Sequence, residues 1–360
     1  MTANPLPYLS PRFCRQFLVG ILAFAISPLV WSQVASVSQP KPKYPLQPMV
    51  RHGRTPEDLS SVSLAGSQLN PDPPFVGEKD DFPTFTRELL QVKWRNGDPI
   101  DLYVMRPKGV AKPPVVLYLY SYPSETDRFR DNNYCARITE GGFAAVGFVS
   151  ALTGQRYSMR PMKEWFVSEM QESLGSSVHD VQMMLNYLST RGDLDMSRVG
   201  MFATGSGASI AILAAAADSR IKAIDLLNPW GDWPDWMAKS AIIPEVERPN
   251  YVKPEFLNKV APLDPVKWLP QLKSQGVRIE RLSNDTVTPQ IAEEKIEAAA
   301  GSTVKVIHYD NVQQFYGAAG GGRVFQWVKA QLHPAQQAKP AERIQTDQSN
   351  GPPLKTGGAG

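Results

Sequence analysis

The feature that most constrains the fold is an alternation of short, wholly apolar runs with segments of helical periodicity. The run PVVLYLY at residues 114–120 is continuous in apolar side chains, as expected of a strand buried on both faces. By contrast, SVHDVQMMLNYLST at residues 177–190 has its apolar side chains at helical spacing. Strands that alternate with helices predict an α/β fold, in which helices cover both faces of a mostly parallel, twisted sheet.

The remaining elements follow from the same patterns. Two strands of a hairpin are expected at residues 84–93 and 100–106, with a turn at residues 96–99. Further buried strands are expected at residues 143–149, 199–203, 221–227, 277–282 and 303–309. Helices are expected at residues 132–140 and 206–217, and from Pro289 and Gly322 onward.

The two ends of the chain differ from this central region. Arg12 and Arg15 precede an apolar run that ends in small residues near Ser32, so residues 1–32 are predicted to be an export signal, with an uncleaved membrane anchor as the alternative. This prediction implies a periplasmic or secreted protein. The Pro-rich residues 33–80 are predicted to form a linker or a surface strap. A hydrolase-like domain would span residues 81–333, and the polar residues 334–360 would form a disordered tail.

Charge and cysteine content narrow the classes of partner and cofactor. The formal net charge is only +3, which argues against nucleic acid or an anionic membrane surface as the main partner. Cys14 would leave with the signal, so Cys135 would have no partner for an internal disulfide. We interpret Cys135 as a buried, small apolar residue. No spacing typical of a metal site or a dinucleotide-binding loop is present, so no cofactor is predicted.

Four stretches occur in an informative order: RGDLDMSRVG at 191–200, APLDP at 261–265, SNDTVTP at 283–289 and HYDNVQQFY at 308–316. They resemble segments of the α/β-hydrolase superfamily, in its dienelactone-hydrolase and acetyl-xylan-esterase-like branch. In that family, the first stretch leads into the strand before the nucleophile, and the second precedes the strand that carries the acid. The third contains the acid, and the fourth delivers the histidine. The resemblance covers residues 84–333 and implies that fold, an esterase or peptidase ancestry and a short helical cap insert at residues 228–268.

The resemblance also assigns the positions of a catalytic triad. The nucleophile elbow falls on ATGSG at residues 203–207, which places Gly205 where the serine would stand. The acid position holds Asp285, and the histidine position falls on Gln314 in a predicted loop. Glutamine cannot take a proton from a hydroxyl at neutral pH. The sequence therefore predicts an impaired hydrolase that binds a ligand or partner, and a purely structural role at the cell surface remains an alternative.

A working hydrolase of unusual design is the second interpretation. Ser206 would then be the nucleophile of an ester hydrolase, with Asp285 and either His308 or His179 supplying the base. The simpler interpretation makes the Ser206 hydroxyl a partner of N–H groups at the helix start. His308 would likewise be a half-buried strand residue.

Two features suggest where a small-molecule, carbohydrate or ester ligand would bind. The backbone N–H groups of Tyr122, Ser206 and Gly207 would surround a space that Gly205 leaves empty, so a carboxylate, phosphate or sugar oxygen is expected there. Trp230 and Trp233 lie in the predicted cap and are expected either to stack on the ligand or to pack the cap onto the domain.

Overall fold

The computed structural model describes residues 57–67, 69, 73–95, 98–153, 166–272 and 276–333. All of these belong to one compact unit, residues 53–360, which is distinct from residues 1–52. The predicted export signal at residues 1–32 and the predicted tail at residues 334–360 lie outside the described residues. Among the helices in the described ranges, none is both long and apolar enough to span a bilayer.

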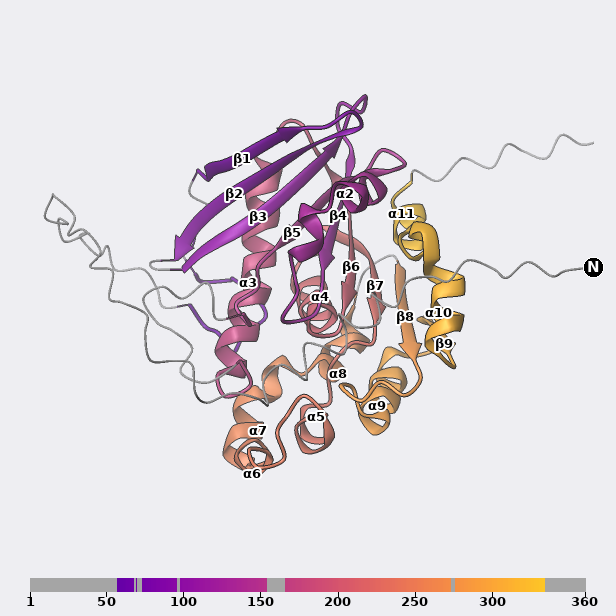
Figure 1. Cartoon of the computed structure of the whole chain (residues 1–360). Helices are drawn as coiled ribbons and strands as arrows, with labels where there is room; N and C mark the ends of the chain where they lie inside the picture. Colours follow the sequence, from indigo (N-terminus) through magenta and orange to yellow (C-terminus); the bar gives the residue numbers. More distant parts are fainter. Residues whose placement is uncertain are drawn as a thin grey trace, which may run out of the picture. The chain divides into compact units, whose positions relative to one another are not determined.

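The described part is built on a sheet of nine strands in the order β1-β2-β3-β5-β4-β6-β7-β8-β9 (Figure 1). Strands β1 to β3 and the contact of β3 with β5 are antiparallel, and all pairs from β5 to β9 are parallel. The strands are β1 (Phe75–Asp81), β2 (Phe85–Arg95), β3 (Asp98–Pro107), β4 (Pro114–Leu119), β5 (Ala144–Phe148), β6 (Asp195–Thr204), β7 (Ile221–Leu227), β8 (Gly276–Leu282) and β9 (Lys305–Tyr309).

The strand order reverses beside β4, and this reversal fixes where a site is expected. From β4 the chain first goes to β5 on one side and then to β6 on the other. In open α/β sheets, ligands bind outside the carboxyl ends of the strands at such a switch point. The loops after β4 and β6 therefore define the region in which the functional site should lie.

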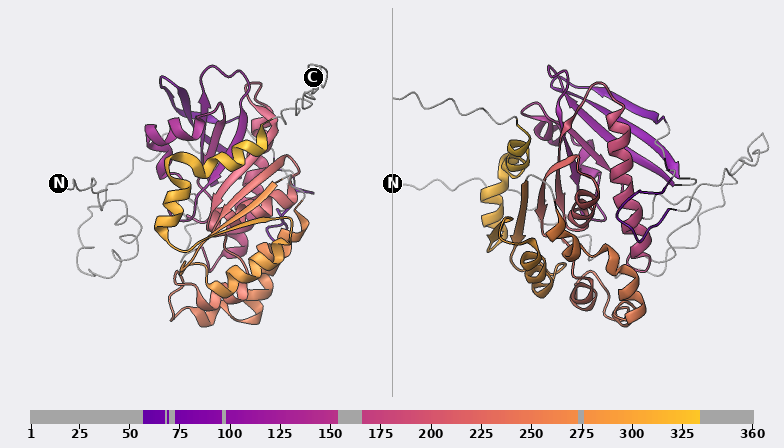
Figure 2. Two further views of the ribbon diagram at one scale, coloured as in Figure 1. Left: turned by 90° about the vertical axis from the view of Figure 1, so that its right-hand side faces the viewer. Right: turned by 180° about the vertical axis from the view of Figure 1, so that it is seen from behind.

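Helices cover both faces of the sheet (Figure 2). One core cluster joins the sheet to α3 and α4, and a second joins it to α2 and α11. The longer helices are α2 (Asn132–Thr139), α3 (Met170–Ser189), α4 (Ser206–Ala217), α9 (Gln290–Ala300), α10 (Val312–Ala319) and α11 (Gln326–Leu332). Between β7 and β8 the chain forms α5 (Trp233–Lys239), α6 (Arg248–Tyr251), α7 (Pro254–Val260) and α8 (Pro265–Trp268). Short 3-10 turns are η1 (Asp127–Arg130), η2 (Ala261–Leu263), η3 (Leu269–Gln271) and η4 (Gly320–Phe325).

The predicted α/β fold is confirmed, and three elements differ from the sequence-based expectations. Helix α3 begins at Met170, about two turns before the predicted start at Ser177, because Ser173, Leu174 and Gly175 are also packed against the domain. Strand β1 begins at Phe75, within residues 33–80 where the sequence predicted a linker, and pairs with β2. Helix α10 replaces the loop that was expected around Gln314.

Residues 57–64 of the predicted linker lie along α3. The backbone of Leu59 is so close to Gly175 that a Cβ on this glycine would lie 2.9 Å from the Leu59 carbonyl carbon. The side chain of Gln182 donates to the Val62 carbonyl at 2.7 Å and accepts from the Leu64 N–H at 3.2 Å. These contacts cover α3 with a strap, one of the two arrangements that the composition had suggested.

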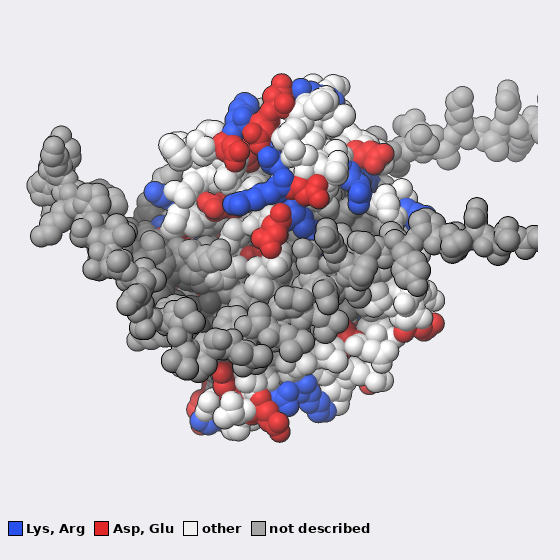
Figure 3. All heavy atoms as spheres, in the orientation of Figure 1, with Lys and Arg blue, Asp and Glu red and all other residues white. Residues whose placement is uncertain are grey.

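Charged side chains on the face shown in Figure 3 are mixed in sign. Ion pairs also join groups of opposite sign around Glu88 of β2. Arg191 pairs with Glu88 at 2.7 Å and with Asp193 at 2.8 Å, and Lys79 of β1 pairs with Glu88 at 3.2 Å. On the described part of this face, positive and negative groups are interleaved.

Candidate functional site

The turn from β6 into α4 occurs at Gly205. This residue has φ 53° and ψ −121°, a conformation that glycine adopts far more readily than residues with a side chain. Ser206 is the first residue of α4 and is buried. The strand–turn–helix geometry of a nucleophile elbow is therefore present, and its apex carries no side chain.

The space beside the apex is filled by the side chain of Ser121, from the loop after β4. A Cβ placed on Gly205 would collide with the Ser121 Oγ, and it would lie 2.8 Å from the Ser121 Cβ and 3.1 Å from Trp230 Nε1. The sequence predicted an empty anion-binding volume beside Gly205, and this prediction is wrong. A side chain from the neighbouring loop, which the local sequence does not reveal, already occupies it.

The N–H groups that would form an oxyanion hole are also engaged. Ser206 N–H donates to Ser121 Oγ at 3.3 Å, and Tyr122 N–H donates to Ser206 Oγ at 2.9 Å. The two hydroxyls lie 3.5 Å apart. The Ser206 hydroxyl thus accepts from the loop after β4, rather than from its own helix as the sequence suggested. The two serine hydroxyls thus accept from the N–H groups that would otherwise stabilise a developing oxyanion.

Gly207 keeps the role that the elbow pattern assigns to it. A Cβ at this position would lie 2.6 Å from the Leu119 carbonyl carbon and 2.9 Å from the Tyr120 carbonyl oxygen. Its lack of a side chain therefore lets α4 start directly against the end of β4. This close approach brings Ser206 to the Ser121–Tyr122 loop and closes the site.

Asp285 lies after β8 at the acid position, but its carboxylate binds an amide rather than an imidazole. Asn228 Nδ2 donates to Asp285 Oδ2 at 3.0 Å, and the Val287 N–H donates to Oδ1 at 2.9 Å. The Asn228 amide oxygen in turn accepts from the Leu282 N–H at 2.8 Å. Burial raises the pKa of Asp285, and these hydrogen bonds oppose the rise. The carboxylate thus joins the ends of β7 and β8.

Gln314 stabilises the start of α10. Its Oε1 accepts from the Asp310 N–H at 2.5 Å, while the Asn311 side chain accepts from the Gln314 N–H at 2.9 Å. The arrangement is similar to a capping box, except that the Gln314 side chain accepts from the residue before the N-cap Asn311 rather than from Asn311 itself. The Gln314 side chain is exposed and engaged with the backbone of its own turn, so it does not supply the function of a catalytic histidine.

The two histidines considered as substitute bases are held elsewhere. His179 is 1% exposed, with Nδ1 2.6 Å from Glu57 Oε1 and Nε2 2.8 Å from the Ser61 carbonyl oxygen. The His308 side chain is 51% exposed, and its Nε2 lies 3.3 Å from Glu297 Oε1. Both rings contact carboxylates other than Asp285, so the structure does not assemble the Ser206–Asp285–His308 set.

The tryptophans of the predicted cap are packed into the domain. Trp230 and Trp233 are 3% and 1% exposed. Trp236 packs against both: its ring is tilted towards Trp230 at a centroid distance of 5.0 Å and meets Trp233 edge to face at 5.8 Å. Trp233 Nε1 also donates to the Leu263 carbonyl at 3.1 Å. Stacking on a ligand requires an accessible ring face, so in this conformation these rings serve packing.

Other reactive groups give no alternative centre. Within the described ranges, no group of three or more His, Cys, Asp or Glu side chains could hold a metal ion. Cys135 is buried, and burial raises the pKa of its thiol to about 11, which keeps it in the unreactive protonated form.

Sequence reasoning missed two residues that define this site. Ser121 and Asn228 follow the buried strands β4 and β7, and their side chains reach Ser206 and Asp285 respectively. Their positions in the sequence could have identified them. Both follow strands that neighbour β6, and the carboxyl ends of parallel strands lie at the same edge of a sheet.

Comparison with known proteins supports the fold. The chain is similar in structure to acetyl xylan esterase 1 from Thermoanaerobacterium sp. (TM-score 0.54, 15% identity, 71% of this chain and 88% of that chain). It is similarly related to the acetyl xylan esterase from Paenibacillus sp. R4 (TM-score 0.54, 15% identity, 76% and 90%). An S-formylglutathione hydrolase from Agrobacterium tumefaciens matches with TM-score 0.53 and 15% identity over 71% and 99%.

The sequence comparisons add nothing to this: no family profile matches the sequence, and no curated protein sequence is significantly similar to it. The chain has the α/β-hydrolase fold. At 15% identity, these likenesses show the fold alone.

Proposed function

We propose that this protein is an α/β-hydrolase-fold protein that has lost triad-based ester hydrolysis and acts by binding. The observation that carries the proposal is the pair of serines at the elbow. Ser121 Oγ lies in the space of the missing nucleophile side chain and accepts from the Ser206 N–H, and Ser206 Oγ accepts from the Tyr122 N–H. An oxyanion would have to displace both hydroxyls before it reached these donors.

The surroundings of Ser206 also oppose its use as a nucleophile. A serine needs a base within hydrogen-bond reach to accept its proton. The described hydrogen bonds of Ser206 Oγ involve Tyr122 N–H and the hydroxyl of Ser121, neither of which can act as a base at neutral pH. The carboxylate of Asp285 is bound to Asn228. These contacts support a binding role over slow hydrolysis.

Turnover of p-nitrophenyl acetate tests this proposal, because an activated ester reveals even weak hydrolases. Wild type and Ser206→Ala are expected to release nitrophenolate at the same rate, close to that of buffer containing an equal concentration of an inert protein. A fluorophosphonate probe is expected to leave Ser206 unlabelled. Turnover that disappears in Ser206→Ala, together with a labelled Ser206, would establish an active hydrolase.

A second part of the proposal concerns the ligand. Acetylated xylo-oligosaccharides are the first class to test, since acetyl xylan esterases are among the proteins that share this fold. Because Trp230 and Trp233 are buried, a sugar could stack on their rings only if the segment of residues 228–268 moved. A saturable change in tryptophan fluorescence would support this site, and an unchanged spectrum at millimolar sugar would exclude it for this class.

We also propose that the protein is exported through a signal at residues 1–32. The support is the pattern of Arg12 and Arg15 before an apolar run. Cell fractionation and mass spectrometry of the intact mature chain test it. Cleavage near Ser32 and recovery outside the cytoplasm are expected, whereas a full-length chain in the membrane fraction would indicate an anchor.

A further inference from the structure

The last strand of the sheet, β9, has no strand paired to its outer edge within the part of the chain that the structure describes. β9 pairs with β8 on one side, and among the described residues the order of the sheet ends there. A parallel edge strand has backbone N–H and C=O groups directed away from the sheet, and such an edge is a ready template for another extended segment. The sheet can thus be extended at β9 by an added strand.

The two faces of this edge differ chemically. Val306 and His308 point to the face covered by α9, since Val306 lines a hollow against that helix and His308 contacts Glu297 on it. Tyr309 points to the opposite face and packs on Phe315 of α10, with ring centroids 5.3 Å apart. An added strand would follow the same alternation, with successive side chains on opposite faces.

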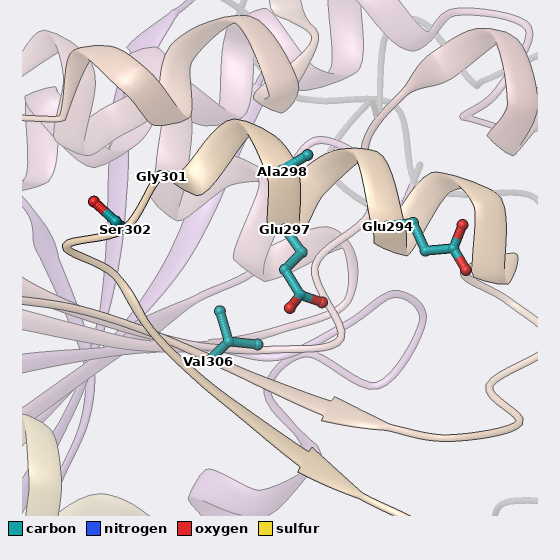
Figure 4. Close-up of a pocket in the computed structure, with 6 residues that line it drawn as sticks. All are labelled: Glu294, Glu297, Ala298, Gly301, Ser302 and Val306. Atoms are coloured by element: carbon teal, nitrogen blue, oxygen red, sulfur yellow. The ribbon is translucent and has the colours of Figure 1, made fainter.

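The α9 face is hollowed and acidic (Figure 4). A surface hollow of about 600 Å³ lies between the helix and β9, and Figure 4 shows the Glu297 side chain and Val306 approaching each other across it. Arg281 forms an ion pair with Glu297 at 2.5 Å and so offsets its negative charge. The described contact of Glu294 is instead a hydrogen bond from the uncharged Gln290 amide at 2.8 Å. The lining residues are Glu294, Glu297, Ala298, Gly301, Ser302 and Val306.

The opposite face of β9 presents the buried Tyr309 and, by the alternation along the strand, the exposed Lys305. Helix α10 covers it and exposes Val312 and Tyr316, which are 43% and 53% accessible. These side chains are four residues apart in the helix, so they lie on the same side of it. The edge of β9 therefore lies between an acidic hollow on one face of the sheet and exposed apolar side chains on the helix that covers the other.

We propose that the β9 edge binds an extended peptide in which basic and apolar residues alternate. Backbone hydrogen bonds to β9 would supply affinity. The basic side chains would enter the α9 hollow beside Glu294, and the apolar ones would pack towards Val312 and Tyr316. This inference does not depend on the loss of hydrolysis, because α9 and β9 lie outside the elbow.

Fluorescence anisotropy with a labelled, end-blocked peptide of alternating lysine and valine tests the proposal. Binding is expected to weaken by about tenfold or more in Glu294→Lys. The matched control is Glu255→Lys, which makes the same charge change at an exposed position of α7 and should leave binding unchanged. Circular dichroism checks that both variants are folded.

Two further peptides separate strand addition from simple charge attraction. A peptide of identical composition with its lysines and valines in blocks should bind at least about tenfold more weakly, because its side chains cannot be sorted between the two faces. The alternating peptide with N-methylated amides should lose binding, because it cannot pair with β9. Equal binding of all three peptides would overturn the proposal.

Other occupants of the edge give distinct results. If a second copy of the chain covers β9, the wild type will sediment as a dimer and Glu294→Lys will change its mass. If residues 334–360 cover it, the peptide will bind only after their removal. Either result, or no binding of the alternating peptide at millimolar concentration, would contradict the proposed partner.

Discussion

The Ser121 side chain occupies the volume into which a side chain on Gly205 would project. The Ser121 Oγ also accepts from the N–H of Ser206, the first residue of α4, at 3.3 Å. The loop after β4 and the turn after β6 are thus complementary in shape and in hydrogen bonding. This complementarity explains why a glycine at the apex leaves no cavity behind it.

A Gly205→Ala substitution is expected to destabilise the protein by about 2–4 kcal/mol. The added methyl group combines a strained positive φ with a collision against Ser121 and Trp230. Urea unfolding measures the effect. Gly192→Ala is the matched control, because a Cβ there meets nothing within 4 Å and the backbone is not in the positive-φ region.

Removing the Ser121 side chain should partly rescue this variant. In Ser121→Gly/Gly205→Ala the collision with the hydroxyl is gone, so the double variant should be more stable than the sum of the single effects by about 1 kcal/mol or more. Additive effects would mean that Ser121 does not fill the space beside the apex.

Ser206→Ala should lower stability while leaving ester turnover unchanged. The substitution removes the acceptor of the Tyr122 N–H in a buried site, and an unsatisfied buried donor costs about 1–3 kcal/mol. Thermal unfolding and p-nitrophenyl acetate turnover are measured on the same preparation. A loss of turnover without a loss of stability would assign Ser206 to catalysis instead.

Glu57→Gln should destabilise the domain by about 2–4 kcal/mol, because Arg95 and His179 lose their shared carboxylate in a largely buried site. Asp58→Asn is the control: the neighbouring carboxylate is bonded to Ser60 in an exposed turn. Limited proteolysis should cut residues 57–64 faster in Glu57→Gln. Equal unfolding curves for the two variants would show that the strap is not held by this carboxylate.

The pH dependence of this contribution has a definite sign. The pKa of Glu57 is lowered: burial alone would raise it, but Arg95 and His179 outweigh that effect. The folded state therefore releases the proton more readily than the unfolded chain. The stabilisation is present above the ordinary value of 4.5 and is lost as the pH falls below it. Glu57→Gln should lack this acid-sensitive component.

Lys329 gives a pH dependence of the same sign, but in the alkaline range. Burial lowers the pKa of its ammonium group to about 8 from 10.5, although its Nζ donates to the Glu140 carbonyl at 2.6 Å. Between these two pH values the unfolded chain binds more protons, so stability rises with pH. Relative to Lys329→Met, the wild type should gain roughly 1–2 kcal/mol across this window, after allowance for solvent screening. Parallel stability curves would contradict the lowered pKa.

The strands and helices of the parallel region were predictable because their signals are local. PVVLYLY forms β4 at residues 114–119, and the alanine-rich segment after Gly205 forms α4 at residues 206–217. Strand β1 was not predicted, since five of its seven residues, Gly77 to Asp81, are glycine or charged and its strand state depends on pairing with β2. The start of α3 was misplaced because its first turns are buried by tertiary contacts: Met170 and Leu174 pack in the core and Gly175 lies against Leu59 of the strap.

The sequence by itself determined the order of the strands from β2 to β9, the glycine at the elbow and the glutamine at the histidine position. These depend on spacing along the chain, which a sequence preserves directly. Only the tertiary structure decided what occupies the site: Ser121 against Gly205, Asn228 on Asp285, and His179 under the strap. Each of these contacts joins segments that are distant in the chain, and only the packing of the sheet, its helices and the strap brings them together.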